Sequence, residues 1–301
     1  MYDIIIIGAG PAGLTSALYA LRANKKVLVL EKSTYGGQII NTGVIENYPG
    51  VKNITGYDYA TNLYEQVTDL NGKIVYEEVV KIDEDKKVYT TKNVYQAKSI
   101  IIATGVNRRK LNIPNEEELT GKGVSYCAIC DGGFYKNKIV AVNGGGNTAI
   151  EDALYLADVA KKVYLIHRRD TFRAEQKYID ELKNKDNVEF VLNSNIISIN
   201  GKDYVESIDI NEDGQERNIP INGLFIAIGQ EPNNDNFKNI IELENGYVKS
   251  SDGVHTNCKG IYVAGDTRVK DLRQLTTAVS DGATAATVAI KEMEDNYGKR
   301  N

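Results

Sequence analysis

The sequence contains no tryptophan, two histidines and three cysteines among its 301 residues. Three cysteines are too few to crosslink a secreted scaffold, and in a reducing compartment a close pair is typical of a catalytic or metal-binding site. No apolar run approaches the ~18 residues of a membrane span, and the apolar segment at residues 2–7 has neither a basic leader nor a small-residue cleavage site. We therefore expect a cytoplasmic protein.

The sequence also lacks an excess of positive charge. It has 36 Lys and Arg against 41 Asp and Glu, a net charge of -5 and a pI near 5.3. Without a basic field, nucleic acid is a poor candidate partner. The hydrophobic fraction of 42% and the charged fraction of 26% are ordinary for a globular protein, and the length allows two domains.

The amino-terminal segment has the pattern of a dinucleotide-binding βαβ unit. The expected strand "YDIIII" (2–7) is followed by "GAGPAG", a helical pattern (14–23) and a second expected strand, "KVLVLE" (26–31). Gly8 permits the tight turn, Gly10 allows backbone N–H groups to approach a pyrophosphate, and Gly13 allows close helix packing. Glu31 ends the second strand, where a carboxylate can bind a ribose diol. Dinucleotide binding is favoured over a simple glycine-rich turn because the first strand, the helix, the second strand and the acid all occur at the expected spacing around the glycines.

The same pattern recurs 136 positions later, where Gly144, Gly146 and Ala149 correspond to Gly8, Gly10 and Gly13. The expected elements are the strand "KIVAVN" (138–143), a helix over 150–160 and the strand "KKVYLIHRR" (161–169). His167 replaces the acid and is followed by Arg168, Arg169 and Arg173. Arginine forks suit a ribose 2′-phosphate, which predicts NADPH rather than NADH. The alternative is a solvated basic cluster after a strand.

Two further expected strands, "SIIIATG" (99–105) and "GLFIAIG" (223–229), end in Ala-x-Gly, and a third, "GIYVAGD" (260–266), ends in an acid. The third strand precedes a long expected helix of small residues, 276–293. Asp266, at the end of the strand segment, can bond a cofactor hydroxyl. We predict an α/β fold with two Rossmann-like dinucleotide-binding domains. The first is discontinuous, residues 1–112 and 243–301, and the second, 113–242, is inserted into it.

Cys127 and Cys130 form a CxxC just before the first strand of the second domain. In such a pair one thiol attacks as the thiolate and the other resolves the mixed disulfide. Asp131 follows directly and is either a proton donor or an ordinary turn residue. Two nucleotide sites with a CxxC suggest hydride transfer through a flavin to a disulfide.

Two other interpretations of the cysteines stay open, zinc binding and a pair of buried thiols. His255 and Cys258 would complete a four-ligand zinc site, but 124 residues separate them from the CxxC and they belong to the other predicted domain. His255 is more simply a surface residue and Cys258 a small core residue. We predict no metal site.

The chain resembles the low-molecular-weight, bacterial-type thioredoxin reductases of the pyridine nucleotide-disulfide oxidoreductase family. The shared motifs are "GAGPAGL", "GGQI", "ENYPG", "ATG", "SYCAICDG", "GGGNTA", "HRRDTFRA", "AGD" and "RQLTTAVSDGATAA", in this order. The resemblance implies FAD and NADPH as cofactors, thioredoxin as the disulfide substrate, a homodimer and rotation of the NADPH domain.

The resemblance also assigns roles to residues. Cys130 would face the flavin, Cys127 would attack the substrate disulfide, and Asp131 would be the proton donor. The predicted FAD residues are Gly8, Gly10, Pro11, Ala12, Gly13, Glu31, Lys32, Gly37, Gln38, Asn47, Ala103, Thr104, Gly105, Gly265, Asp266, Arg273, Gln274 and Leu275. The predicted NADPH residues are Gly145, Gly146, Asn147, Thr148, His167, Arg168, Arg169, Arg173 and Gly229.

The expected function is therefore NADPH-dependent reduction of thioredoxin through FAD and the Cys127–Cys130 pair. One alternative is a thioredoxin reductase that takes electrons from ferredoxin or another flavoprotein, and the retained arginines argue against it. The other is a nucleotide-sensing binding protein whose CxxC is structural or holds zinc.

Overall fold

The computed structural model describes residues 1–298, which form two compact units. Unit 1 contains Met1–Asn107 together with the chain from Glu231 onward, and unit 2 contains Arg108–Gln230. In each unit, helices pack against one face of the parallel strands, and antiparallel strands pack against the other face. This confirms the predicted α/β class with two dinucleotide-binding-type folds.

The main sheet of unit 1 has the strand order β5-β2-β1-β8-β7-β6, and β21 pairs with β8. Strands β1, β2, β5, β8 and β21 are parallel, whereas β6, β7 and the first half of β8 are antiparallel. The bounds are β1 Tyr2–Ile7, β2 Val27–Glu31, β5 Lys73–Tyr76, β6 Val79–Ile82, β7 Lys87–Thr90, β8 Val94–Ile102 and β21 Ile261–Val263. Two short pairs lie outside this sheet, β3 Val44–Ile45 with β4 Ile54–Thr55, and β19 Leu243–Glu244 with β20 Tyr247–Val248.

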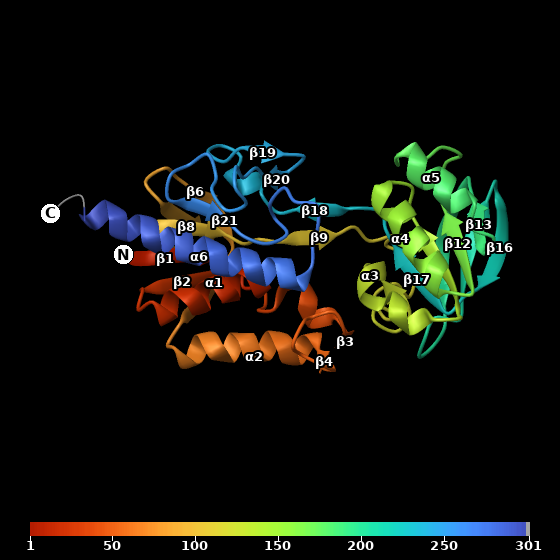
Figure 1. The fold of residues 1–301 in the computed structure, drawn as a ribbon, viewed down its shortest axis with the longest axis horizontal. Coiled ribbons are helices and arrows are strands. Elements are labelled where there is room, and N and C mark those ends of the chain that lie inside the picture. Colours follow the sequence, from red (N-terminus) through yellow and green to blue (C-terminus); the bar gives the residue numbers. More distant parts are fainter. Residues whose placement is uncertain (299–301) are drawn as a thin grey trace. The chain divides into compact units, whose positions relative to one another are not determined.

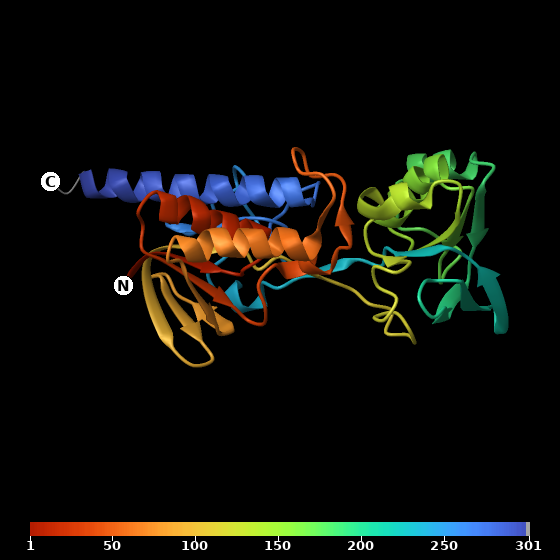
Figure 2. The same ribbon diagram turned by 90° about the horizontal axis from the view of Figure 1, so that it is seen from below.

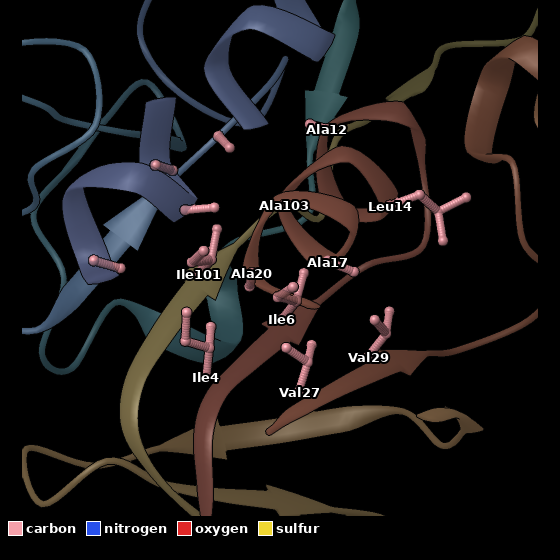
Figure 3. Packing of buried hydrophobic residues seen from close by; sticks show 14 of the residues in the cluster. Ile4, Ile6, Ala12, Leu14, Ala17, Ala20, Val27, Val29, Ile101 and Ala103 are labelled. Carbon is pink, nitrogen blue, oxygen red and sulfur yellow. The ribbon is translucent and has the colours of Figure 1, made fainter. Parts of the chain in front are cut away.

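Strand β1 is buried on both faces because its side chains alternate between two cores. Ile4 and Ile6 join the helix-side core with Val27 and Val29, as Figure 3 shows, whereas Ile5 and Ile7 join the core on the opposite face. This explains the continuous isoleucine run, which is typical of a parallel strand covered on both sides.

Three helices cover the helix-side core: α1 Pro11–Arg22, α2 Gly56–Asp69 and α6 Leu275–Gly298. Helix α1 begins at Pro11, whose fixed φ suits the first turn, three residues before the predicted start. Thr55 is the N-cap of helix α2, and its hydroxyl accepts the Asp58 N–H at 3.0 Å. Helix α6 runs beside α1 (Figure 2), so closely that a Cβ at Gly282 would lie 2.3 Å from the Ala12 carbonyl oxygen.

The parallel sheet of unit 2 has the order β10-β17-β11-β12-β13. Its strands are β10 Val124–Ser125, β11 Ile139–Asn143, β12 Lys162–Ile166, β13 Val188–Val191 and β17 Gly223–Ile226. Helices α3 Ala128–Asp131, α4 Asn147–Val159 and α5 Gln176–Lys183 pack against one face. The antiparallel sheet of β14 Ser194–Asn200, β15 Ser207–Glu212 and β16 Gln215–Pro220 packs against the other face.

The prediction of a strand over 161–169 was wrong at its carboxyl end. Strand β12 stops at Ile166, because its partner β13 ends opposite it at Val191. His167 and the two arginines after it therefore lie in a loop and not in the strand.

Two short strands connect the units, β9 Val106–Arg108 and β18 Gln230–Pro232, and they pair with each other. The unit boundaries fall after Asn107 and Gln230, five residues before the first predicted crossing, after 112, and twelve residues before the second, after 242. The side chains explain the difference. Leu111 packs on the core of unit 2, whereas Phe237 is buried in the core of unit 1.

Candidate functional site

The turn after β1 has the geometry of a pyrophosphate-binding turn. Gly8 has φ +108°, and a Cβ there would lie 2.3 Å from the Ala103 carbonyl oxygen. A Cβ at Gly13 would lie 1.9 Å from the Gly8 carbonyl oxygen. Gly10 is the N-cap of α1, and no side chain of the described residues caps this helix. Pro11, in the first turn, has no N–H, so the amide groups of α1 that are open to an anionic ligand begin with that of Ala12.

Glu31 is preorganised to bind hydroxyl groups next to that turn. Its side chain is 8% exposed. One carboxylate oxygen accepts the Ala9 N–H at 2.8 Å and the other accepts the Ser33 N–H at 2.9 Å. The oxygen bonded to Ala9 keeps a second lone pair for a ribose hydroxyl, whereas the other oxygen also accepts the Ser33 hydroxyl at 3.4 Å. Lys32 follows as an exposed residue.

Two distant segments also meet in unit 1. The Asn47 amide donates to the Gln274 side-chain oxygen at 3.0 Å, across 227 residues of sequence. Gly37 lies against Gly10, since a Cβ at Gly37 would be 3.2 Å from the Gly10 Cα. Gln38 is exposed in the 3-10 turn Gly37–Asn41. The motifs predict that Gly37, Gln38, Asn47 and Gln274 bind FAD. The structure places Gly37 against the turn after β1 and joins Asn47 to Gln274.

The ends of β8 and β21 are joined by buried polar contacts. The hydroxyl groups of Thr104 and Thr267 lie 2.8 Å apart, and both reach the side-chain oxygen of Asn234. The Gly265 N–H donates to Asp281 at 3.1 Å. Gly105 and Gly265 have φ +62° and +81°, which favour glycine. These contacts fix the backbone between Ala103 and Gly105 and place Asp266 after β21.

Arg273 precedes helix α6 and is fixed in place. Its guanidinium lies 4.2 Å from the Tyr247 ring centroid, and its Nε donates to the Asp266 carbonyl oxygen at 3.2 Å. Leu275 begins α6. Taken together, the open helix terminus, the preorganised acid and the glycines whose Cβ positions are occupied by backbone fit a dinucleotide such as FAD in unit 1.

The turn after β11 repeats this geometry in unit 2. A Cβ at Gly144 would lie 2.4 Å from the Ala227 carbonyl oxygen, as one at Gly8 would from Ala103. Gly146 is the N-cap of α4, which likewise has no side-chain cap among residues 1–298. Asn147 and Thr148 are exposed in the first turn. Gly229, with φ +108°, accepts the Arg109 N–H at 3.1 Å and lies at the exit from unit 2.

A basic loop is fastened onto that turn. The Arg173 N–H donates to the Gly145 carbonyl oxygen at 2.7 Å, and the Glu175 N–H donates to the Asn147 side-chain oxygen at 2.9 Å. The His167 ring packs against Gly145 and stacks on Phe172 with centroids 5.3 Å apart. These contacts hold the loop beside the amino terminus of α4.

The loop carries three cations without counterions. Within the described part of the chain, Arg168, Arg169 and Arg173 make no ion pair with a carboxylate, and all three are exposed. Burial lowers the pKa of His167, and the charges of the three arginines lower it further. The imidazole is therefore neutral at pH 7, and the guanidinium groups fit a ligand phosphate such as the 2′-phosphate of NADPH.

Cys127 and Cys130 form a disulfide with their Cα atoms 5.3 Å apart. Cys127 is the N-cap of α3 and Cys130 lies within this helix, and the Cys130 N–H points to the Cys127 sulfur at 3.2 Å. The same N–H would stabilise a thiolate on Cys127 after reduction. Cys258 is a free thiol in unit 1 whose Sγ donates to the Ile240 carbonyl oxygen at 2.9 Å.

Asp131 has the environment of an acid rather than that of a solvated turn residue. Burial raises its pKa, while the hydrogen bond from Ser125 and the charge of Arg108 act in the opposite direction. The Ser125 hydroxyl donates to the Asp131 carboxylate at 2.5 Å. A carboxyl group with a raised pKa, next in sequence to the cysteine pair, can accept and return protons during thiol–disulfide exchange.

Sequence reasoning missed the residues that support this pair. Ser125 is 5% exposed and contacts both Cys127 and Asp131. Tyr126 donates to the buried Glu116 carboxylate at 2.8 Å, and Arg108 lies over its ring. The only feature of the sequence that could have indicated one of these residues is the position of Ser125, two residues before the first cysteine.

A cleft of about 690 Å³ in unit 1 is lined by Glu84, residues 238–243, Asn257 and Cys258. None of these residues is among the predicted site residues. In the described chain, no three His, Cys, Asp or Glu side chains are grouped so that they can hold a metal ion. Across residues 1–298, no helix has the length and apolar character needed to cross a membrane.

Comparison with known proteins gives matches over nearly the whole chain. Residues 2–282 match the family model of the pyridine nucleotide-disulphide oxidoreductases. The thioredoxin reductase of Mycoplasma genitalium is 42% identical over 296 residues, which cover 95% of this chain and 93% of the relative. That of Listeria monocytogenes is 42% identical over 306 residues, with 98% and 95% covered.

Solved structures give the same result. The thioredoxin reductase of Streptococcus pyogenes superposes with a TM-score of 0.94 at 42% identity, covering 98% of this chain and 99% of that one. A ferredoxin-flavin thioredoxin reductase from Clostridium acetobutylicum matches with a TM-score of 0.53 at 31% identity, with 98% of each chain covered.

Proposed function

The chain belongs to the pyridine nucleotide-disulphide oxidoreductase family, among the thioredoxin reductases, and from this membership we propose that it transfers electrons from NADPH through FAD to oxidised thioredoxin. The observation that carries the proposal is the Cys127–Cys130 disulfide with Asp131 beside it. A disulfide next to an acid with a raised pKa can be reduced and can then exchange with a second disulfide.

FAD is proposed for unit 1 and NADPH for unit 2. In unit 1 the turn Gly8–Gly13 and Glu31 would hold the pyrophosphate and ribose. In unit 2 the turn Gly144–Gly146 and the three arginines would hold the nucleotide and its 2′-phosphate. When bound, the flavin supplies a two-electron carrier between the nicotinamide and the disulfide.

The protein residues carry out the exchange with thioredoxin. The Cys127 thiol gives its proton to Asp131 while its sulfur attacks one sulfur of the substrate disulfide. The departing thiolate takes a proton from Asp131. Cys130 then gives its proton to Asp131 while its sulfur attacks the Cys127 sulfur. The second substrate thiolate takes that proton, so the substrate leaves as a dithiol and the enzyme disulfide reforms.

An exposed apolar surface supports a protein substrate at this pair. Ile129, between the two cysteines, is 51% exposed, and Phe134, four residues after Cys130, is 42% exposed. Large apolar side chains exposed together beside a reactive group are typical of a docking surface.

Steady-state oxidation of NADPH in the presence of a bacterial thioredoxin tests the proposal. The wild-type protein should consume NADPH at a rate that depends on oxidised thioredoxin, and C127S and C130S should not. Flavin-containing protein without thioredoxin-dependent turnover would contradict the proposal.

The alternative electron donor is ferredoxin, which the name of the Clostridium acetobutylicum protein includes. The three arginines without counterions on the second nucleotide turn favour NADPH. Anaerobic mixing with NADPH alone separates the two donors, because a ferredoxin-dependent enzyme would keep its flavin oxidised.

We also propose, from family membership, a cytoplasmic homodimer. Sedimentation velocity of the flavin-loaded protein should give twice the 33.2 kDa mass of the chain. A monomer at micromolar concentration would contradict the dimer.

A further inference from the structure

Lys270 is a buried cation of unit 1, in the segment between β21 and α6, and its side chain is 6% exposed. A lysine is rarely buried to this degree without a counterion, because removing its charge from water is costly. Its ammonium nitrogen lies 3.0 Å from Oδ2 of Asp281 and 3.8 Å from Oδ1 of Asp266. Lys270 therefore lies between two carboxylates, one on α6 and one after β21.

The first of these carboxylates, that of Asp281, has a cation of its own. Arg268 donates to both of its oxygens, from Nε at 2.8 Å and from a terminal nitrogen at 2.9 Å. The Gly265 N–H donates to the same carboxylate at 3.1 Å. In a bidentate pair of this kind one guanidinium balances one carboxylate. The charge of Lys270 is then balanced by Asp266, so the two cations and two carboxylates of the cluster sum to zero.

The two oxygens of Asp266 are not equivalent. Oδ1, which faces Lys270, is buried, although the side chain as a whole is 30% exposed. Oδ2 is therefore the oxygen that a ligand can reach. The backbone here is held as well, because the Asp266 carbonyl oxygen accepts Nε of Arg273 at 3.2 Å. A Cβ at Gly265 would lie 2.8 Å from the Cβ of Ala12, so this segment packs on the first turn of α1.

We propose that Lys270 is a positioning residue for FAD: its ammonium holds Oδ1 of Asp266 and leaves Oδ2 for a hydroxyl group of the cofactor. The inference rests on the proposed function, in which FAD occupies unit 1 and Asp266 bonds one of its hydroxyls. Glu31 is proposed to hold the ribose next to the pyrophosphate turn, and the other hydroxyl groups of FAD lie on its ribityl chain. The hydroxyl for Asp266 is therefore one that ADP lacks.

Dilution of the holoprotein tests the inference without turnover, because FAD released from the protein fluoresces and the released fraction gives its Kd. In K270M the Kd of FAD should rise roughly tenfold, as expected when one charge-assisted hydrogen bond is lost. Competition with ADP in the same assay should give the wild-type affinity for ADP. K98M removes a lysine that pairs with Asp3 near the start of β1, and as the matched control it should leave both affinities unchanged.

A double-mutant cycle separates positioning from a purely structural role. D266N should weaken FAD binding, and adding K270M to D266N should cost no further affinity, because the lysine then has no carboxylate to orient. K270Q, a second uncharged variant, should behave like K270M.

Three results would overturn the inference: wild-type affinity for FAD in K270M and K270Q, an equal loss of affinity for ADP, or additive losses in the cycle. A wild-type protein that holds no FAD would overturn the proposed function and this role together, whereas those three results overturn the role alone.

Discussion

The Ser125 hydroxyl oxygen lies 2.5 Å from the Asp131 carboxylate and 3.1 Å from the Cys127 backbone nitrogen. One serine therefore connects the acid to the attacking cysteine. It donates to the first and accepts from the second, so it orients both.

Replacing Ser125 with Ala should slow thioredoxin reduction roughly tenfold, since a lost hydrogen bond to a charged group is worth about 1.5 kcal/mol. The pKa of Asp131 should rise, because the serine favours its ionised form. S125T keeps the hydroxyl and is the control. Steady-state kinetics from pH 6 to pH 9 measure the effect, and equal rates for S125A and S125T would count against this role.

Removing two of the arginines should change the nucleotide preference. In the double variant R168Q/R169Q the KM for NADPH should rise roughly 30- to 150-fold, as expected for about 2–3 kcal/mol of lost charge-assisted bonds. The KM for NADH should change little. R217Q removes an arginine of the same unit that pairs with Glu189 and Glu212, and it should leave both values unchanged. A parallel loss for both nucleotides would place the 2′-phosphate elsewhere.

The sequence predicted those parts of the site whose geometry depends on single residue types. A glycine at position 8 or 144 is required because backbone from another strand occupies the Cβ position, so both turns could be recognised. Arg108 and Glu116 could not be found in this way. Arg108 ends the three-residue strand β9 and Glu116 lies in a turn, so neither segment has a periodic pattern, and only the folded chain brings both residues to Tyr126. The end of β12 was missed for a similar reason, since it depends on the length of β13.

Asp152 should make the stability of unit 2 depend on pH. Its pKa is raised to about 7 by burial and then by Glu151, so the folded state is penalised as the pH rises from about 4 through 7 and the group ionises. D152N lacks this penalty. Its stability relative to the wild type should increase between pH 4 and pH 8 by up to about 4 kcal/mol, the equivalent of about three pKa units, and by less where solvent reaches the side chain.

Urea unfolding at both pH values measures this difference. For E151Q, at the exposed neighbouring position, the difference in stability from the wild type should change little between the two pH values. A constant difference between D152N and the wild type would contradict the burial of an ionising group.

His255 should stabilise unit 1 at acid and neutral pH. Its two ring nitrogens lie 2.6 Å from Asp252 and Glu292, and these hydrogen bonds raise the pKa of His255. The stabilisation is complete below the ordinary value of about 6.5 and is lost as the pH rises through the raised pKa. H255Q should therefore cost about 1 kcal/mol at pH 6 and less at pH 9, since the pairs are partly exposed.

Thermal unfolding at pH 6 and pH 9 checks the expectation. Lys25 forms an exposed pair with Glu294, which lies on α6 as Glu292 does. K25Q breaks this pair and should change the stability equally at both pH values. An effect of H255Q that does not depend on pH would exclude a charged imidazole.

Differential alkylation of the three cysteines tests the central claim most directly, with Cys258 as an internal reference because it is a free thiol. Without NADPH, only Cys258 should be labelled in the unfolded, flavin-released protein. After anaerobic addition of NADPH, Cys127 and Cys130 should be labelled too, and oxidised thioredoxin should then remove that labelling. Labelling of Cys127 and Cys130 that does not respond to NADPH would contradict transfer of electrons to this disulfide.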